Sequence, residues 1–200
     1  MSKLIEFSGT PDAGKTTLIK SLDSELTKNG LSVINLGEAN GESLPPQNLR
    51  GSLAYNEWVG ENACNGILIA LSKNPDVILI DRGLFDFRFW NYFYKNTGKA
   101  TPEDVSALQQ KPIFQRKEII PDLFIAVTVS LEKAITRNPS LARKKDWITT
   151  HNNLFDKFYN TYKGNKVHID TSELSKEETV SASLTIILKK FPELFQIQEL

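Results

Sequence analysis

Three observations in the sequence predict an α/β fold with a parallel sheet. Short apolar segments alternate along the chain with longer segments whose apolar residues recur at helical spacing. One apolar segment, 77–80, is uninterrupted and rich in β-branched residues, which is typical of a strand buried on both faces. The length of 200 residues, 40% of them hydrophobic, suits about one domain. We therefore expect a single three-layer α/β/α domain over residues 1–200, with helices on both faces of a five-stranded parallel sheet.

The predicted strands share runs of apolar residues between polar or turn-forming ones. In chain order they cover residues 3–8, 31–36, 77–80, 123–129 and 166–169. The predicted helices share apolar residues three and four positions apart. In chain order they cover 15–29, 49–73, 84–96, a helix beginning at Thr101, and 131–137, 146–163 and 175–190. Asn29-Gly30 and Asn74-Pro75 end the first two helices, whereas Pro102 suits a first helical position.

The composition argues against several classes of protein. Lys and Arg number 24 and so do Asp and Glu, so a net charge of zero makes a nucleic-acid partner unlikely by default. The single cysteine, Cys64, allows no intramolecular disulfide and argues against a cysteine-based zinc site. No apolar run approaches the roughly 20 residues that cross a bilayer, and the N-terminus does not resemble a signal peptide. We therefore expect a cytoplasmic protein with no membrane partner.

A glycine-rich turn follows the first predicted strand and is typical of phosphate binding. Residues 9–16 read Gly-Thr-Pro-Asp-Ala-Gly-Lys-Thr, which matches the pattern G-x-x-x-x-G-K-[ST]. In this pattern the backbone amides and the start of the next helix face phosphate oxygens, the lysine reaches the β- and γ-phosphates, and the last hydroxyl ligates Mg²⁺. The predicted nucleotide-binding residues are Gly9, Asp12, Ala13, Gly14, Lys15, Thr16 and Thr17. A strand-to-helix turn without a ligand is the alternative.

Charged residues follow the other predicted strands as well. Asp81 and Arg82 end the third strand, where the acid can hold Mg²⁺ and the arginine can bind phosphate; a helix cap beside a solvated arginine is the alternative. The basic segment 137–145 follows the fourth strand and predicts a lid, or else a solvated helix end. Glu38 follows the second strand, as a general base or as an exposed loop acid. The predicted catalytic residues are Lys15, Glu38, Asp81, Arg82, Arg137 and Arg143, and the predicted metal ligands are Thr16 and Asp81.

Together these motifs resemble the thymidylate kinase and deoxynucleoside kinase group of the P-loop nucleoside and nucleotide kinases. The resemblance extends from Leu4 to about Leu188. It implies the strand order 2-3-1-4-5, binding of ATP or GTP, a base at Glu38, and lid arginines at 137 and 143. It also implies that the loop after residues 167–171 packs against adenine. The chain departs from thymidylate kinases at Pro11-Asp12, and it reads Gly-Glu-Ala-Asn over 37–40 where they carry Arg-Glu-Pro-Gly, so the acceptor stays open.

The leading interpretation is an ATP-dependent kinase that transfers the γ-phosphoryl group to a small-molecule acceptor, a nucleoside or a nucleotide, with Mg²⁺ as cofactor. A GTPase is disfavoured, because the Asn-Lys pair at 165–166 lacks the aspartate of the guanine-reading motif. A regulatory or partner-binding ATPase, and a kinase of an RNA end or a protein, are alternatives. The aromatic residues of 84–94 belong either to an acceptor pocket or to the core, and a homodimer is left open.

Overall fold

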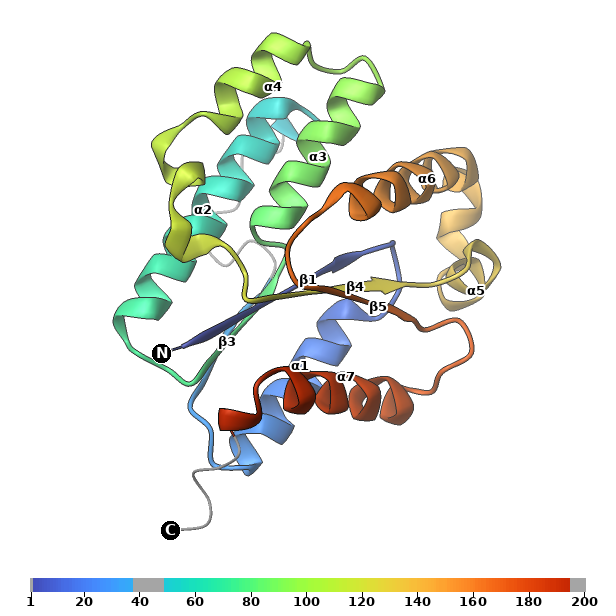
Figure 1. Cartoon of the computed structure of the whole chain (residues 1–200). Helices are drawn as coiled ribbons and strands as arrows, with labels where there is room; N and C mark the ends of the chain where they lie inside the picture. Colours follow the sequence, from blue (N-terminus) through green and yellow to red (C-terminus); the bar gives the residue numbers. More distant parts are fainter. Residues whose placement is uncertain (1, 38–48, 195–200) are drawn as a thin grey trace.

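A five-stranded parallel sheet forms the centre of the computed structural model, which describes residues 2–37 and 49–194 (Figure 1). The strands are β1 (Lys3–Gly9), β2 (Val33–Leu36), β3 (Val77–Asp81), β4 (Leu123–Thr128) and β5 (Lys166–Asp170). They pair in the order β2-β3-β1-β4-β5, and all four pairs are parallel. The predicted α/β class and strand order are thereby confirmed.

Helices cover both faces of this sheet. They are α1 (Lys15–Lys28), α2 (Leu53–Ser72), α3 (Leu84–Asn96), α4 (Pro102–Gln109), α5 (Leu131–Arg137), α6 (Lys145–Thr161) and α7 (Lys176–Lys190). In Figure 1, α1 and α7 lie on one side of the sheet, and α2, α3 and α6 lie on the other. Short 3-10 turns, which the sequence pattern did not predict, cover Pro112–Gln115, Lys117–Ile119, Pro139–Lys144 and Pro192–Leu194.

The alternation of side chains along β1 divides the core into two sides. Ile5 and Phe7 pack with residues of α1 and α7, whereas Leu4 packs with residues of α2. The even-numbered Glu6 and Ser8 therefore face the side of α2 and α3. This placement decides which polar groups meet at the carboxyl edge of the sheet, where ligands bind in folds of this type.

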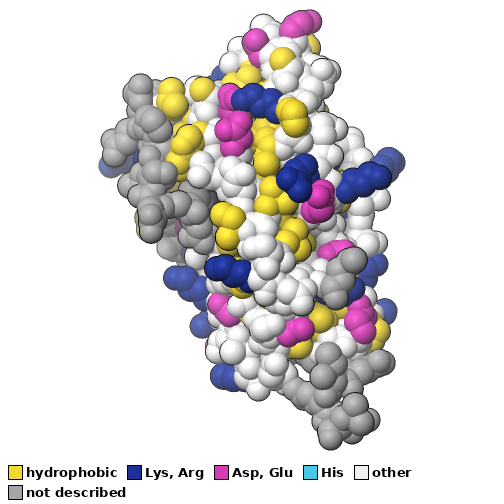
Figure 2. Space-filling model, turned by 90° about the vertical axis from the view of Figure 1, so that its left-hand side faces the viewer, with side chains coloured by type: hydrophobic (Ala, Val, Ile, Leu, Met, Phe, Trp, Pro, Cys, Tyr) yellow, Lys and Arg dark blue, Asp and Glu magenta, His cyan; other side chains and the backbone are white. Residues whose placement is uncertain are grey.

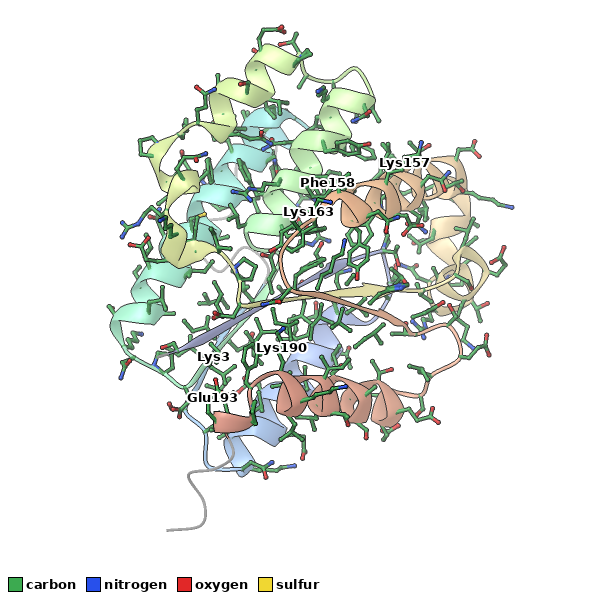
Figure 3. The ribbon with its side chains drawn as sticks, in the orientation of Figure 1. Lys3, Lys157, Phe158, Lys163, Lys190 and Glu193 are labelled. Atoms are coloured by element: carbon green, nitrogen blue, oxygen red, sulfur yellow. The ribbon has the colours of Figure 1, made fainter. Side chains whose placement is uncertain are left out.

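Aromatic rings fill the space between α3, α6 and the sheet. Phe85 stacks on Phe124 of β4, with ring centroids 3.7 Å apart and planes 17° apart. Phe158 of α6, labelled in Figure 3, approaches Phe85 edge-on at 5.1 Å. Phe89 and Phe155 belong to the same buried cluster. Part of the aromatic segment 84–94 therefore belongs to the core.

The start of α2 differs from the predicted one, and an ion pair near the C-terminal end of the described chain was not predicted. Helix α2 begins at Leu53 and not at residue 49, because the side chain of Ser52 caps it by accepting a hydrogen bond from the amide of Tyr55 at 3.2 Å. At the other end of the chain, Lys3 of β1 pairs with Glu193 at 2.7 Å, which ties the turn after α7 to the sheet (Figure 3). The single-domain organisation and the lid at 137–145 stay predictions.

The face on the left of Figure 1 carries hydrophobic side chains between charged ones (Figure 2). The exposed large hydrophobic residues of the described ranges are Ile69, Ile120, Trp147 and Leu188.

Within residues 2–37 and 49–194, no helix combines the length and the apolar character that a membrane crossing requires. A homodimer stays a prediction.

Close packing of α2 on α3 depends on Gly60, and we expect Gly60→Ala to lower the free energy of unfolding by about 1–3 kcal/mol. A Cβ atom at this position would lie 2.4 Å from Cδ2 of the Phe87 ring and 3.1 Å from Phe114. Urea unfolding measures the change. Gly66→Ala in the same helix is the control, because among the described residues its Cβ would meet Leu36 alone, at 3.8 Å. It should raise stability by about 0.5–1 kcal/mol, and equal effects of the two variants would contradict the packing argument.

Candidate functional site

The loop between β1 and α1 is held by the end of β4. The amide of Thr10 donates to the carbonyl of Val127 at 3.1 Å, and the amide of Val129 donates to the Thr10 hydroxyl at 2.9 Å. Gly9 has a φ of 151°, and a Cβ atom there would lie 1.8 Å from the Val127 carbonyl oxygen. Only glycine fits this contact, so the first glycine of the motif fixes the loop against the neighbouring strand.

Lys15, the first residue of α1, lies back across the loop. Its Nζ donates to the carbonyl of Thr10 at 2.8 Å and to that of Gly9 at 3.4 Å, and the residue is only 8% exposed. Gly14 precedes it with a φ of 87°, and a Cβ atom at Gly14 would meet no described atom within 4 Å. No side chain of the described residues caps α1. The loop therefore presents a fixed cation and uncapped helix amides beside open space, which is an arrangement for binding an anion.

Thr16 and Asp81 come together as the sequence predicts. The Thr16 hydroxyl donates to Oδ2 of Asp81 at 2.7 Å, because Asp81 ends β3 on the side of α1. The other oxygen, Oδ1, is buried and has no hydrogen-bond partner among the described residues. A buried carboxylate oxygen without a partner is costly unless a cation satisfies it. The pair fits a hard cation such as Mg²⁺, which prefers oxygen ligands.

A buried glutamate that the sequence analysis missed caps α3. The carboxylate of Glu6 accepts the amides of Gly83 at 2.8 Å, Phe85 at 3.0 Å and Asp86 at 3.0 Å. Burial raises the pKa of Glu6 to about 7, against the lowering effect of these amides. The sequence did contain a signal for this residue, because Glu6 is an acidic residue in the middle of an otherwise mostly apolar predicted strand. The contact fixes the first turn of α3, and with it the positions of Arg82 and Asp86.

Asp86 faces the same side as Ser8. Its Oδ1 accepts a hydrogen bond from the Ser8 hydroxyl at 2.5 Å, and the residue is 5% exposed. Burial raises the pKa of Asp86, whereas Arg82, the Ser8 hydroxyl and Lys15 each lower it. Arg82 has a φ of 65°, a left-handed conformation that is uncommon for a side-chain-bearing residue. Such strain concentrates at functional sites.

Arg82 and Asp86 line a cavity of about 700 Å³, here called the larger cavity. Its walls come from α2, α3 and the start of α6, and they include the aromatic residues Tyr55, Trp90, Phe93, Tyr94 and Trp147. Trp90 and Trp147 stack with centroids 6.4 Å apart and planes 21° apart. The other cations along it are Arg50, Lys99 and Lys144. The aromatic helix thus contributes both to the core, through Phe85 and Phe89, and to the wall of this cavity, through Trp90, Phe93 and Tyr94.

A smaller cavity of about 300 Å³ adjoins the loop, lined by Asp12, Ala13, Gly14, Thr17 and residues after β5. Arg137 borders it and donates to the carbonyl of Asp12 at 3.1 Å and to the carbonyl of Thr171 at 2.8 Å. The Thr171 hydroxyl donates to the carbonyl of Ala13 at 3.1 Å. Arg137 and Thr171 therefore clasp the loop to the end of β5, a role that the sequence analysis did not assign to either.

One of the predicted catalytic residues, Arg143, stands apart from this group. Arg143 is exposed on the turn Pro139–Lys144 and lines neither of the two cavities. Glu38 lies outside the described residues. Asn56 and Trp147 line the larger cavity, and the sequence analysis did not identify either of them as a site residue. Both lie on helices that were predicted from the spacing of apolar residues, which does not show what lines a cavity.

A comparison with protein-family models finds no match, and a comparison with curated proteins finds none either.

We expect Glu6 to make the protein less stable as pH rises from about 4.5 to about 7. In the unfolded chain Glu6 loses its proton near 4.5, whereas the folded protein keeps it until about 7. The folded state therefore binds more protons in this window, and the free energy of unfolding falls by roughly 3 kcal/mol across it. Urea unfolding at several pH values measures the decline, which Glu6→Gln should make smaller, leaving the part that the raised pKa of Asp86 contributes.

Glu173→Gln is the control for this experiment, since Glu173 is an exposed glutamate in the loop before α7. It should keep the wild-type decline. If Glu6→Gln declined as the wild type does, the pH dependence would come from other groups.

Proposed function

We propose that the protein is an ATP-dependent phosphotransferase, a kinase that transfers the γ-phosphoryl group to a small-molecule acceptor of the nucleoside or nucleotide class. One observation carries the proposal: a strand, a glycine-rich loop and a helix hold Lys15 across the loop and the Thr16–Asp81 pair beside it. These are the parts that position a nucleoside triphosphate for transfer of its terminal phosphate. The proposal includes a cytoplasmic location, where the reaction finds its ATP.

The loop and the smaller cavity would take the nucleotide. The amides at the start of α1 and the Lys15 ammonium would bind the phosphates, because both present positive charge in a fixed place. The base and ribose would occupy the smaller cavity between Arg137 and the residues after β5. The Arg137 contacts to Asp12 and Thr171 would keep the loop closed on that side.

Thr16 and Asp81 would hold Mg²⁺, Asp81 by way of water. When bound, the ion would neutralise part of the negative charge of the nucleotide's phosphates. The unpartnered Oδ1 of Asp81 supports this assignment, since the carboxylate has acceptor capacity left after binding the Thr16 hydroxyl.

The larger cavity would take the acceptor. Tyr55, Trp90 and Trp147 offer ring faces on which a planar base can stack. Arg50 and Lys99 add positive charge that suits a phosphate on the acceptor. A walled cavity beside Arg82 favours transfer to an acceptor over a regulatory ATPase, which needs no second substrate site.

We expect Lys15→Ala to lower acceptor-dependent ADP release by at least about 10²-fold, because the fixed charge at the transferring phosphate is lost. ADP release is measured with MgATP and a panel of deoxynucleosides and their 5′-monophosphates. Lys20→Ala is the matched control, since Lys20 is an exposed lysine of the same helix. It should keep the wild-type rate. An unchanged rate in folded Lys15→Ala would refute the nucleotide site.

We expect the reaction to stop in excess EDTA and to resume when Mg²⁺ is restored. Asp81→Asn should raise the Mg²⁺ concentration for half-maximal rate by about 10–100-fold, because an outer ligand of the ion is weakened. Asp156→Asn, at an exposed position of α6, should leave the Mg²⁺ dependence unchanged. Full activity in excess chelator would contradict the metal assignment.

A further inference from the structure

Two carboxylates, the last residue of β3 and a residue in the first turn of α3, have different surroundings. Asp81 lies on the α1 side and binds the Thr16 hydroxyl, so the proposed metal site already uses it. Asp86 lies on the other side, in the first turn of α3, and lines the larger cavity. Among the described residues that line this cavity, Asp86 alone is an acid. The sequence analysis did not count it among the predicted catalytic residues.

We infer that Asp86 is the catalytic carboxylate of this site, the group that binds the acceptor hydroxyl in the larger cavity and takes up its proton. The inference rests on the proposed kinase function and deepens it. It gives to a residue of α3 the role for which the sequence offered Glu38, either as a base or as an exposed loop acid.

Three contacts hold Asp86 in place. The Ser8 hydroxyl donates to Oδ1 at 2.5 Å, which fixes one side of the carboxylate. The backbone amide of Asp86 donates to Glu6 at 3.0 Å, which fixes the helix turn that bears it. The neighbouring amide of Phe85 donates to the same Glu6 carboxylate at 3.0 Å. A group held in this way loses little freedom when it binds a substrate hydroxyl, which is what efficient positioning requires.

The charges around Asp86 suit a proton acceptor beside a phosphoryl group. Burial raises its pKa, which makes the carboxylate a stronger base than an exposed aspartate. Arg82 and Lys15 lower that pKa and so favour the ionised form, whereas Asp81 raises it further. Arg82 lines the same cavity, and its charge acts on the Asp86 carboxylate.

The chemical step balances without any further reactant. The acceptor oxygen forms a bond to the γ-phosphorus, and the bond from that phosphorus to the β,γ-bridging oxygen breaks. Its electron pair remains on the β-phosphate of ADP. The hydroxyl proton passes to the Asp86 carboxylate and then to water. Because phosphoryl transfer has a loose transition state, the carboxylate acts mainly by orienting the hydroxyl, with the proton leaving late.

The experiment compares Asp86→Asn with the wild type in ADP release from MgATP, using deoxynucleosides and their 5′-monophosphates as acceptors. We expect kcat to fall by about 10²–10⁴-fold, with the KM for ATP changed by less than about threefold. Asparagine has nearly the same shape and retains an oxygen for the Ser8 hydroxyl. Binding of a fluorescent ATP analogue and thermal melting of each variant separate a lost base from a lost fold.

If Asp86→Asn does not fold, the Ser8→Ala variant tests the inference in its place. Removing this donor leaves the carboxylate charged but less well oriented, so kcat should fall by about tenfold with ATP affinity retained. Asp156→Asn on α6 is the control and should match the wild type in every readout.

Three results would overturn the inference. If Asp86→Asn, or in its place Ser8→Ala, kept the wild-type kcat while the wild type transfers phosphate, the kinase function would stand and Asp86 would not be its base. If ATP binding and kcat fell together, Asp86 would be a structural residue of the nucleotide site. If the wild type released no ADP with any acceptor of the panel or with water, the proposed function itself would fail, and the inference with it.

Discussion

A buried carboxylate holds the start of α3, one of the helices that wall the larger cavity, against the sheet. Glu6 lies on the central strand, and its two oxygens bind three amides that open the helix after β3. The positive end of the helix offsets part of the desolvation of the carboxylate. Gly83 completes the fit, because a Cβ atom there would lie 2.9 Å from the Glu6 carboxyl carbon. Arg82 and Asp86, on either side of Gly83, take their positions from this contact.

Two helix N-termini follow neighbouring strands, and the protein uses them differently. The N-terminus of α3 is filled by Glu6 from within the fold. The N-terminus of α1 follows Gly14 and is left to the space in front of the loop. The positive N-terminal end of a helix therefore binds a side chain of the fold after β3, whereas after β1 it is available to bind a ligand. Strand β1 contributes to both arrangements, because Glu6 binds the start of α3 and Gly9, three residues later, begins the loop that leads to α1.

Local patterns in the sequence were sufficient for the sheet and for the loop. The apolar periodicity predicted the strands, the glycine-lysine motif predicted the loop, and its resemblance to P-loop kinases supplied the strand order. The Thr16–Asp81 pair could also be predicted from the sequence. Asp81 ends β3 and Thr16 lies in the first turn of α1, so both residues are at the carboxyl edge of the sheet. The missed contacts of Glu6 join residues that are far apart in the chain, and Glu6 and Asp86 are 80 positions apart.

Such contacts depend on which face of a strand meets which turn of a helix, and no local pattern reports that. The start of α2 was misplaced for a related reason, because apolar spacing continued upstream of the cap at Ser52. The role of Arg137 also needed the fold. Its charge was visible in the sequence, but its partners, Asp12 and Thr171, lie 125 and 34 positions away.

The facing indoles at the wall of the larger cavity have a practical consequence. Trp90 and Trp147 are two of the three tryptophans of the chain, and Trp147 is 40% exposed. Indole emission shifts with the polarity of its surroundings and is quenched by nearby rings. A molecule that enters this cavity displaces water from both side chains at once, so the protein reports occupancy through its own ultraviolet fluorescence, without a label and before the chemistry of the ligand is known.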